Sequence, residues 1–127
     1  MKVLLMVFLG GGLGSTLRYL ISKYLNQASY SNSIAIPLGT FTVNIVGSLL
    51  LGLILGLALK YNSVSNTTLL FLATGFCGGF TTFSAFAFEN QELLKSGDYL
   101  HFAVYTLGTL ILGFSAIFAG LYFSKLV

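Results

Sequence analysis

The uncharged run over residues 69–88 carries Gly78-Gly79 and then Thr81-Thr82 at its centre. About 20 apolar residues suffice to cross a bilayer as a helix. Irregular backbone at membrane depth survives only where protein buries it or where it lines a polar cavity, because lipid offers no hydrogen-bond partner. Freed carbonyls there can hold a cation, and helix N-termini can attract an anion. The pattern therefore predicts a membrane helix broken at mid-membrane, with a candidate ion site at the break.

The composition indicates an integral membrane protein. The chain of 127 residues, short enough for one domain, is 56% hydrophobic and 7% charged, with a mean hydropathy of +0.92. Soluble domains average about 25% charged residues. The basic residues are dispersed and the net charge is only +3, which argues against a nucleic-acid surface. Cys77 is the only cysteine, so we expect no disulfide or metal site there and interpret it as a small apolar residue.

Apolar runs predict an all-α protein, a single four-span membrane domain over residues 1–127. The predicted spans are 3–24, 34–60, 68–94 and 99–124, joined by polar connections at 25–33, 61–67 and 95–98. The N-terminal run has no small-residue cleavage site after it, so we interpret it as a retained span rather than a leader. None of the connections is long enough to form a soluble domain.

The basic residues give the chain no preferred orientation. Four spans place both termini and the middle connection on one side. That side carries Lys2, Lys60 and Lys125, and the opposite side carries Arg18, Lys23 and Lys95. The positive-inside rule therefore does not choose between orientations. A chain this small cannot easily enclose a pore alone, so we expect an antiparallel, dual-topology homodimer.

Two polar residues within the spans leave alternatives open. Asn44 could offer amide N–H donors to an anion, or it could form an ordinary interhelical hydrogen bond. Arg18 could be a vestibule charge that attracts anions, or it could extend to the headgroups.

Phenylalanines recur every third residue at Phe80, Phe83 and Phe86. On one helix they would drift slowly around a face, which usually means packing. Because a ring edge carries the positive part of the quadrupole, rings turned edge-on could also contact a poorly solvated anion.

The titratable residues do not form a catalytic site. Glu89, Glu92 and Asp98 are the only acids, and all lie late in the third span or in its connection, so no carboxylate is expected at mid-membrane. His101 is expected near the interface without a titratable partner. With no nucleophile, base or metal cluster, we expect that the protein is not an enzyme.

Glycine pairs four residues apart fit the small-xxx-small pattern that allows helices to approach closely. The pairs are Gly10/Gly14, Gly52/Gly56 and Gly75/Gly79. We interpret them mainly as packing positions.

Three motifs spread over the chain resemble the Fluc (CrcB) family of fluoride channels. They are Gly-Gly-Leu-Gly-Ser-Thr-Leu-Arg at 11–18, Gly-Thr-Phe-Thr-Val-Asn at 39–44, and Gly-Phe-Cys-Gly-Gly-Phe-Thr-Thr-Phe-Ser at 75–84. The resemblance covers the whole chain, and the last motif is long and specific.

The resemblance implies a passive, fluoride-selective channel of the cell (plasma) membrane that exports fluoride from the cytoplasm and relieves its toxicity. It implies an antiparallel homodimer with two pores. It also implies a central structural sodium ion, held by the backbone carbonyls of Gly78 and Thr81 from each subunit.

By position, the resemblance implies pore phenylalanines at Phe83 and Phe86. The other positions it implies for the fluoride pathway are polar: Arg18, Thr40, Asn44, Ser84, Tyr105 and Thr109. The family usually has Thr or Ser where this chain has Ala85, so one hydroxyl is missing beside the phenylalanine pair.

Two other classes of protein compete with this interpretation. A small dual-topology drug/proton exporter has a similar length and charge balance, but it needs a carboxylate in its first span, and residues 1–24 contain none. A non-transporting assembly subunit would explain the glycines but not the Gly-Gly-x-Thr-Thr interruption.

Overall fold

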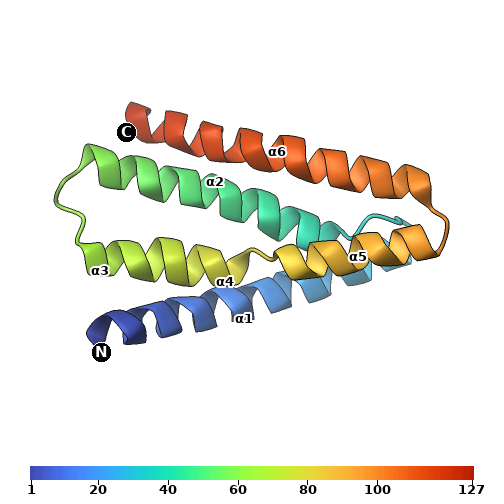
Figure 1. The fold of residues 1–127 in the computed structure, drawn as a ribbon, viewed down its shortest axis with the longest axis horizontal. Coiled ribbons are helices and arrows are strands. Elements are labelled where there is room, and N and C mark those ends of the chain that lie inside the picture. The colour runs from blue at the N-terminus through green and yellow to red at the C-terminus, as the bar shows by residue number, and fades with distance from the viewer.

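The computed structural model describes residues 1–127 as helices joined by short turns, with no strands. Figure 1 shows the long helices lying side by side, with both chain termini at the same end. The elements in chain order are α1 (Lys2–Ser31), α2 (Leu38–Lys60), α3 (Asn66–Leu69), η1 (Leu70–Cys77), α4 (Gly78–Phe80), α5 (Phe83–Lys95) and α6 (Tyr99–Leu126). The π-helical η1 joins α3 to α4 without interruption, whereas two extended residues separate α4 from α5.

Four helical segments are long and apolar enough to cross a membrane: Lys2–Ser31, Leu38–Lys60, Asn66–Lys95 and Tyr99–Leu126. Their outward faces carry large apolar side chains such as Phe8, Phe114 and Phe118, all more than half exposed. A continuous apolar surface of this kind suits lipid rather than water. The chain is a multi-pass membrane protein, and the all-helical fold expected from the sequence is confirmed.

The first helix is longer than the sequence predicts. Residues 25–33 are expected to be a connection, but α1 continues to Ser31. The polar residues of this segment bind the next turn instead of forming a loop. Asn26 Oδ1 accepts the Gly39 N–H at 2.9 Å, and Ser29 Oγ lies 3.0 Å from the Ile36 carbonyl oxygen. These bonds fix the start of α2 against the last turns of α1.

The small residues bring the helices together in two pairs. On the α1 side, a Cβ added to Gly14 would collide with the Phe76 carbonyl, and one added to Gly79 would meet the Gly11 Cα at 3.0 Å. Between α2 and α6, a Cβ on Gly52 would collide with the Ile117 carbonyl. Backbones this close tolerate no side chain, so packing by the predicted small-xxx-small pairs is confirmed.

The third membrane-spanning segment changes its packing partner at the break. Before the break, η1 and α4 pack along α1; after it, α5 packs against α6 and α2, and it has no contact with α1. Phe86 and Leu93 of α5 form a buried cluster with Tyr105 of α6. The break thus lies where the chain passes from one helix pair to the other.

Candidate functional site

The helix break consists of two extended threonines. Thr81 has φ −85° and ψ 159°, and Thr82 has φ −151° and ψ 120°. Each hydroxyl caps a helix end: Thr81 Oγ1 donates to the Cys77 carbonyl at 2.9 Å at the end of α4, and Thr82 Oγ1 accepts the Ala85 N–H at 3.3 Å at the start of α5. The sequence pattern centres the break on Gly-Gly and Thr-Thr together, but Gly78 and Gly79 remain helical. Threonine suits the break because its hydroxyl accepts a backbone N–H at the start of a helix, a bond for which glycine has no side-chain oxygen.

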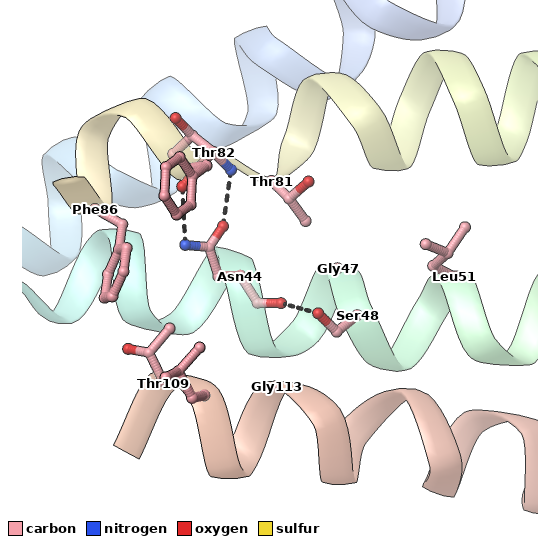
Figure 2. Close-up of a pocket in the computed structure, with 11 residues that line it drawn as sticks. Asn44, Gly47, Ser48, Leu51, Thr81, Thr82, Phe86, Thr109 and Gly113 are labelled. Atoms are coloured by element: carbon pink, nitrogen blue, oxygen red, sulfur yellow. Dashed lines mark hydrogen bonds between the residues drawn. The ribbon is translucent and has the colours of Figure 1, made fainter. Parts of the chain in front are cut away.

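Asn44 of α2 binds the break through its whole side-chain amide (Figure 2). Its Oδ1 accepts the Thr82 N–H at 2.7 Å, and its Nδ2 donates to the Thr82 carbonyl at 3.0 Å. The amide thus substitutes for the backbone partners that Thr82 would have in a helix. One of its two N–H donors is used in this way, and the other is left for the pocket described below.

Both carbonyls that the resemblance assigns to sodium lose their helical partners. In a continuous helix the Gly78 carbonyl would accept from the Thr82 amide, which instead donates to Asn44. The Thr81 carbonyl would accept from the Ala85 amide, which instead donates to Thr82 Oγ1. The Gly78 carbonyl of α4 and the Thr81 carbonyl of the break therefore both lack their usual helical donors. The chain has no cluster of three acidic, histidine or cysteine side chains, so a cation here would depend on backbone oxygens.

Arg18 reaches the break from α1. Its Nε donates to the Gly79 carbonyl at 2.9 Å, in a half-buried position. The guanidinium therefore lies at the C-terminal end of α4, where the helix dipole favours positive charge. Arg18 lines none of the pocket that contains Asn44.

A pocket of about 260 Å³ lies between α2, the break and α6. Figure 2 shows Asn44 and Thr82 on one side of it and Thr109 of α6 on the other. Four residues predicted for the fluoride pathway line this pocket, namely Asn44, Phe83, Phe86 and Thr109, and so does Thr81, which is predicted for the sodium site. Thr109 Oγ1 is fully buried and has no hydrogen-bond partner. A buried hydroxyl without a partner is costly, and it is available to a ligand in the pocket.

The two predicted pore phenylalanines differ in exposure. Phe86 is buried and meets the Tyr105 ring edge to face, with centroids 5.2 Å apart. Phe83 is 79% exposed, and its centroid lies 5.9 Å from that of Phe86. Phe80 does not belong to the same row, because it precedes the break and stacks on Phe76 instead. The single three-residue row suggested by the sequence is therefore wrong, although Phe83 and Phe86 do lie together.

Glu89 is the residue that the sequence reasoning did not include in the site. Its Oε1 accepts from Thr40 Oγ1 at 2.6 Å, and its Oε2 accepts from Tyr105 Oη at 2.7 Å. Thr40 and Tyr105 are both buried, so this carboxylate joins α2, α5 and α6 behind the phenylalanine pair. One signal could have found it: Glu89 follows Phe86 by three residues and so shares its helix face.

Ser84 is the predicted pore residue least integrated into the site. It is exposed, and its hydroxyl lies 3.2 Å from Thr82 Oγ1. Ala85, which stands where the family usually has a hydroxyl, uses its backbone N–H for the Thr82 cap.

At the turn before α6, His101 has the titratable partner that the sequence reasoning did not expect. Its Nδ1 lies 2.8 Å from the Asp98 carboxylate, and its backbone N–H donates to Asp98 Oδ1 at 3.2 Å. The side-chain bond to His101, helped by the backbone bond, lowers the pKa of the Asp98 carboxyl below its usual range. The bond from the His101 backbone N–H to the Asp98 side chain makes Asp98 the N-cap of α6.

The helix bundle and the pocket beside its broken helix define a small multi-pass membrane protein with a polar site inside the bundle. The family model described as "CrcB-like protein, Camphor Resistance (CrcB)" matches residues 5–121. The chain belongs to this family, which confirms the resemblance carried by the motifs.

Curated relatives cover nearly the whole chain. One from Gloeothece citriformis is 50% identical over 125 residues, which are 98% of each chain. One from Chlorobium phaeobacteroides is 47% identical over 96% of this chain and 92% of its own length. One from Phocaeicola vulgatus is 43% identical over 98% of this chain and 100% of its own. All three are named "Fluoride-specific ion channel FluC", the name of a channel and not of an enzyme, as the sequence predicts.

Proposed function

We propose that this protein is a passive fluoride channel that exports fluoride across the cell membrane. The pocket carries the proposal, because it combines ring edges, an amide donor and an unpartnered hydroxyl, and no acid lines it. Relatives named as fluoride-specific channels over nearly the full length of the chain support it.

The pocket residues suit a small anion that must lose water. The spare Asn44 N–H and the Thr109 hydroxyl can replace water as donors. Phe83 and Phe86 can present positive ring edges. The Glu89 carboxylate behind the phenylalanine pair has one hydroxyl donating to each of its oxygens, which reduces its repulsion of an anion.

The pathway would be completed by a second copy in the opposite orientation, giving two pores. Unlike the lipid-facing phenylalanines, Phe83 lines the polar pocket and is still 79% exposed, so one chain alone leaves this side of the pocket uncovered. The equal number of basic residues on the two sides supports insertion in both orientations.

Lysine pairs test the antiparallel dimer. Lysines in place of the exposed residues Asn62 and Ser63 add positive charge to one end of the bundle, and lysines in place of Ser31 and Asn32 add it to the other end. Each loaded variant should be inactive alone, and the two together should restore fluoride efflux. If either variant conducts alone, the dual-topology arrangement is wrong.

The backbone at the break fits a structural sodium ion. The Gly78 and Thr81 carbonyls have lost their helical donors, and two subunits would together offer four hard oxygen ligands. When bound, sodium would supply fixed positive charge between the two pathways.

Efflux from liposomes tests the channel itself. Purified protein should release fluoride without a proton gradient and should release chloride far more slowly, with protein-free liposomes as the control. Equal chloride efflux, or a strict requirement for a proton gradient, would refute the proposal. Replacing sodium with potassium over long equilibration should slow the fluoride efflux; a rate that does not depend on the cation would remove sodium from the proposal.

A further inference from the structure

Two side chains from different helices bind the break. Each donates to a backbone carbonyl whose preceding carbonyl has no hydrogen-bond donor. Arg18 from α1 donates to the Gly79 carbonyl, which directly follows that of Gly78. Asn44 from α2 donates to the Thr82 carbonyl, which directly follows that of Thr81. The Phe80 carbonyl, which follows that of Gly79 and precedes the extended Thr81, has no donor either, so three carbonyls at the break are free: those of Gly78, Phe80 and Thr81.

The end of a helix offers several carbonyls to any cation that approaches. A side-chain donor removes one carbonyl from that set and fixes the peptide that carries it. We propose that Arg18 is a positioning residue: by binding the Gly79 carbonyl it withdraws that oxygen from an approaching cation and fixes the end of α4, so that the neighbouring Gly78 carbonyl is positioned as the cation ligand. This inference rests on the cation site within the proposed function.

The geometry favours this role over that of a charge that attracts fluoride. The bond from Nε to the carbonyl measures 2.9 Å, and Arg18 lines no part of the pocket that contains Asn44, Phe83 and Phe86. The guanidinium also lies at the negative end of a helix, where its charge is offset by the carbonyls.

Three substitutions of Arg18 separate the hydrogen bond from the charge. In Arg18→Gln the side-chain NH₂ is attached to Cδ, as Nε is in arginine, so a donor remains without the charge. Arg18→Met keeps the side-chain length as far as the Nε position but has neither donor nor charge. Arg18→Lys keeps the charge but moves the donor one atom further along the chain.

The readout is sodium-dependent thermal stabilisation of the purified full-length protein in detergent, with choline chloride at equal ionic strength as the control. A ligand that binds only the folded state raises the melting temperature in a saturable way. This measurement is independent of fluoride transport. Fluoride efflux is measured in parallel on the same preparations.

Arg18→Met should raise the half-effective sodium concentration about tenfold, because a bond from a charged donor is lost. Arg18→Gln should raise it only about threefold, since neutral bonds are roughly half as strong. A Met variant with the parent's sodium response would overturn the inference. The inference would also be overturned if Arg18→Lys had the parent's sodium response while Arg18→Gln responded like Arg18→Met, because the charge alone would then matter. If Arg18→Met does not fold, the sodium responses of Arg18→Gln and Arg18→Lys are compared instead, and a weaker response in Arg18→Gln than in Arg18→Lys would overturn the inference.

Failure of the inference is distinguishable from failure of the proposed function. If sodium does not stabilise the parent protein, both the cation site and the inference are wrong, whatever the fluoride efflux. If sodium stabilises the parent protein, and the Arg18 variants need more sodium in the expected order, but fluoride does not pass, then the channel proposal fails and the role of Arg18 stands.

Discussion

Gly47 of α2 faces the break, and its replacement tests how tightly the break is packed. A Cβ at position 47 would collide with Thr81 Cγ2 and would lie 3.1 Å from Phe80 Cδ1. Overpacking of this kind costs about 1–3 kcal/mol, whereas alanine in place of a helical glycine returns about 1 kcal/mol. Gly47→Ala should therefore lower the free energy of unfolding by roughly 0–2 kcal/mol, and it should slow fluoride efflux by displacing Thr81.

The companion substitution Thr81→Ser makes the prediction sharper. Serine keeps the hydroxyl that donates to the Cys77 carbonyl but lacks the methyl group that the new Cβ would strike. In the Thr81→Ser background, Gly47→Ala should become neutral or stabilising by up to about 1 kcal/mol. The double-mutant cycle, followed by unfolding in detergent and by efflux, measures this coupling.

Gly12 provides the control because nothing lies within 4 Å of a Cβ added there. Gly12→Ala should be neutral or stabilising in both backgrounds. If Gly47→Ala costs the same in the parent and in the Thr81→Ser background, or if Gly12→Ala is equally harmful, the reasoning about contact at the break is refuted.

Three further predictions concern the site and its surroundings. Phe83→Ile and Phe86→Ile should each slow fluoride efflux at least tenfold, which corresponds to roughly 1.4 kcal/mol of lost interaction with the ion. The control Phe114→Ile, on the outer face of α6, should leave efflux unchanged. If both pocket variants conduct like the parent, the two phenylalanines serve only in packing. Glu89→Gln should lower stability by about 1–2 kcal/mol and reduce efflux, because an amide has one acceptor oxygen for two hydroxyl donors; unchanged stability and flux would contradict the network. Asp98→Ala should lower the melting temperature at neutral pH. Since the pKa of Asp98 is lowered by folding, its contribution is complete above about pH 4 and is lost as the pH falls through the lowered pKa; a difference that persists in stronger acid would exclude the charged cap.

The sequence predicts the long helices well because bilayer thickness sets a minimum length that apolar runs reveal directly. It predicts the end of α1 poorly. Polar residues at 25–33 suggest a loop, but Asn26 and Ser29 are polar because they bind the backbone of the next turn. Composition cannot distinguish a solvated residue from one whose partner lies in another element.

The candidate site is partly predictable for a similar reason. The Gly-Gly-x-Thr-Thr pattern predicts a break, because those residues weaken a helix or cap its end. It does not predict that Asn44 and Arg18 bind successive parts of the break, since both are distant in the sequence. The sequence does not predict the role of Glu89 for the same reason, because its partners Thr40 and Tyr105 belong to α2 and α6. The Asp98–His101 pair, by contrast, has the spacing of a helix cap and could have been recognised.

The two extended threonines have a consequence for how length changes propagate along the chain. In an unbroken helix, one inserted residue turns everything beyond it by about 100° about the axis. Here the rotation of α5 is fixed by Asn44 at its start and by the packing of Phe86 on Tyr105, not by the winding of η1 and α4. The wide turns of the π-helix can therefore match the glycines of α1 without changing the face that α5 presents to the pocket.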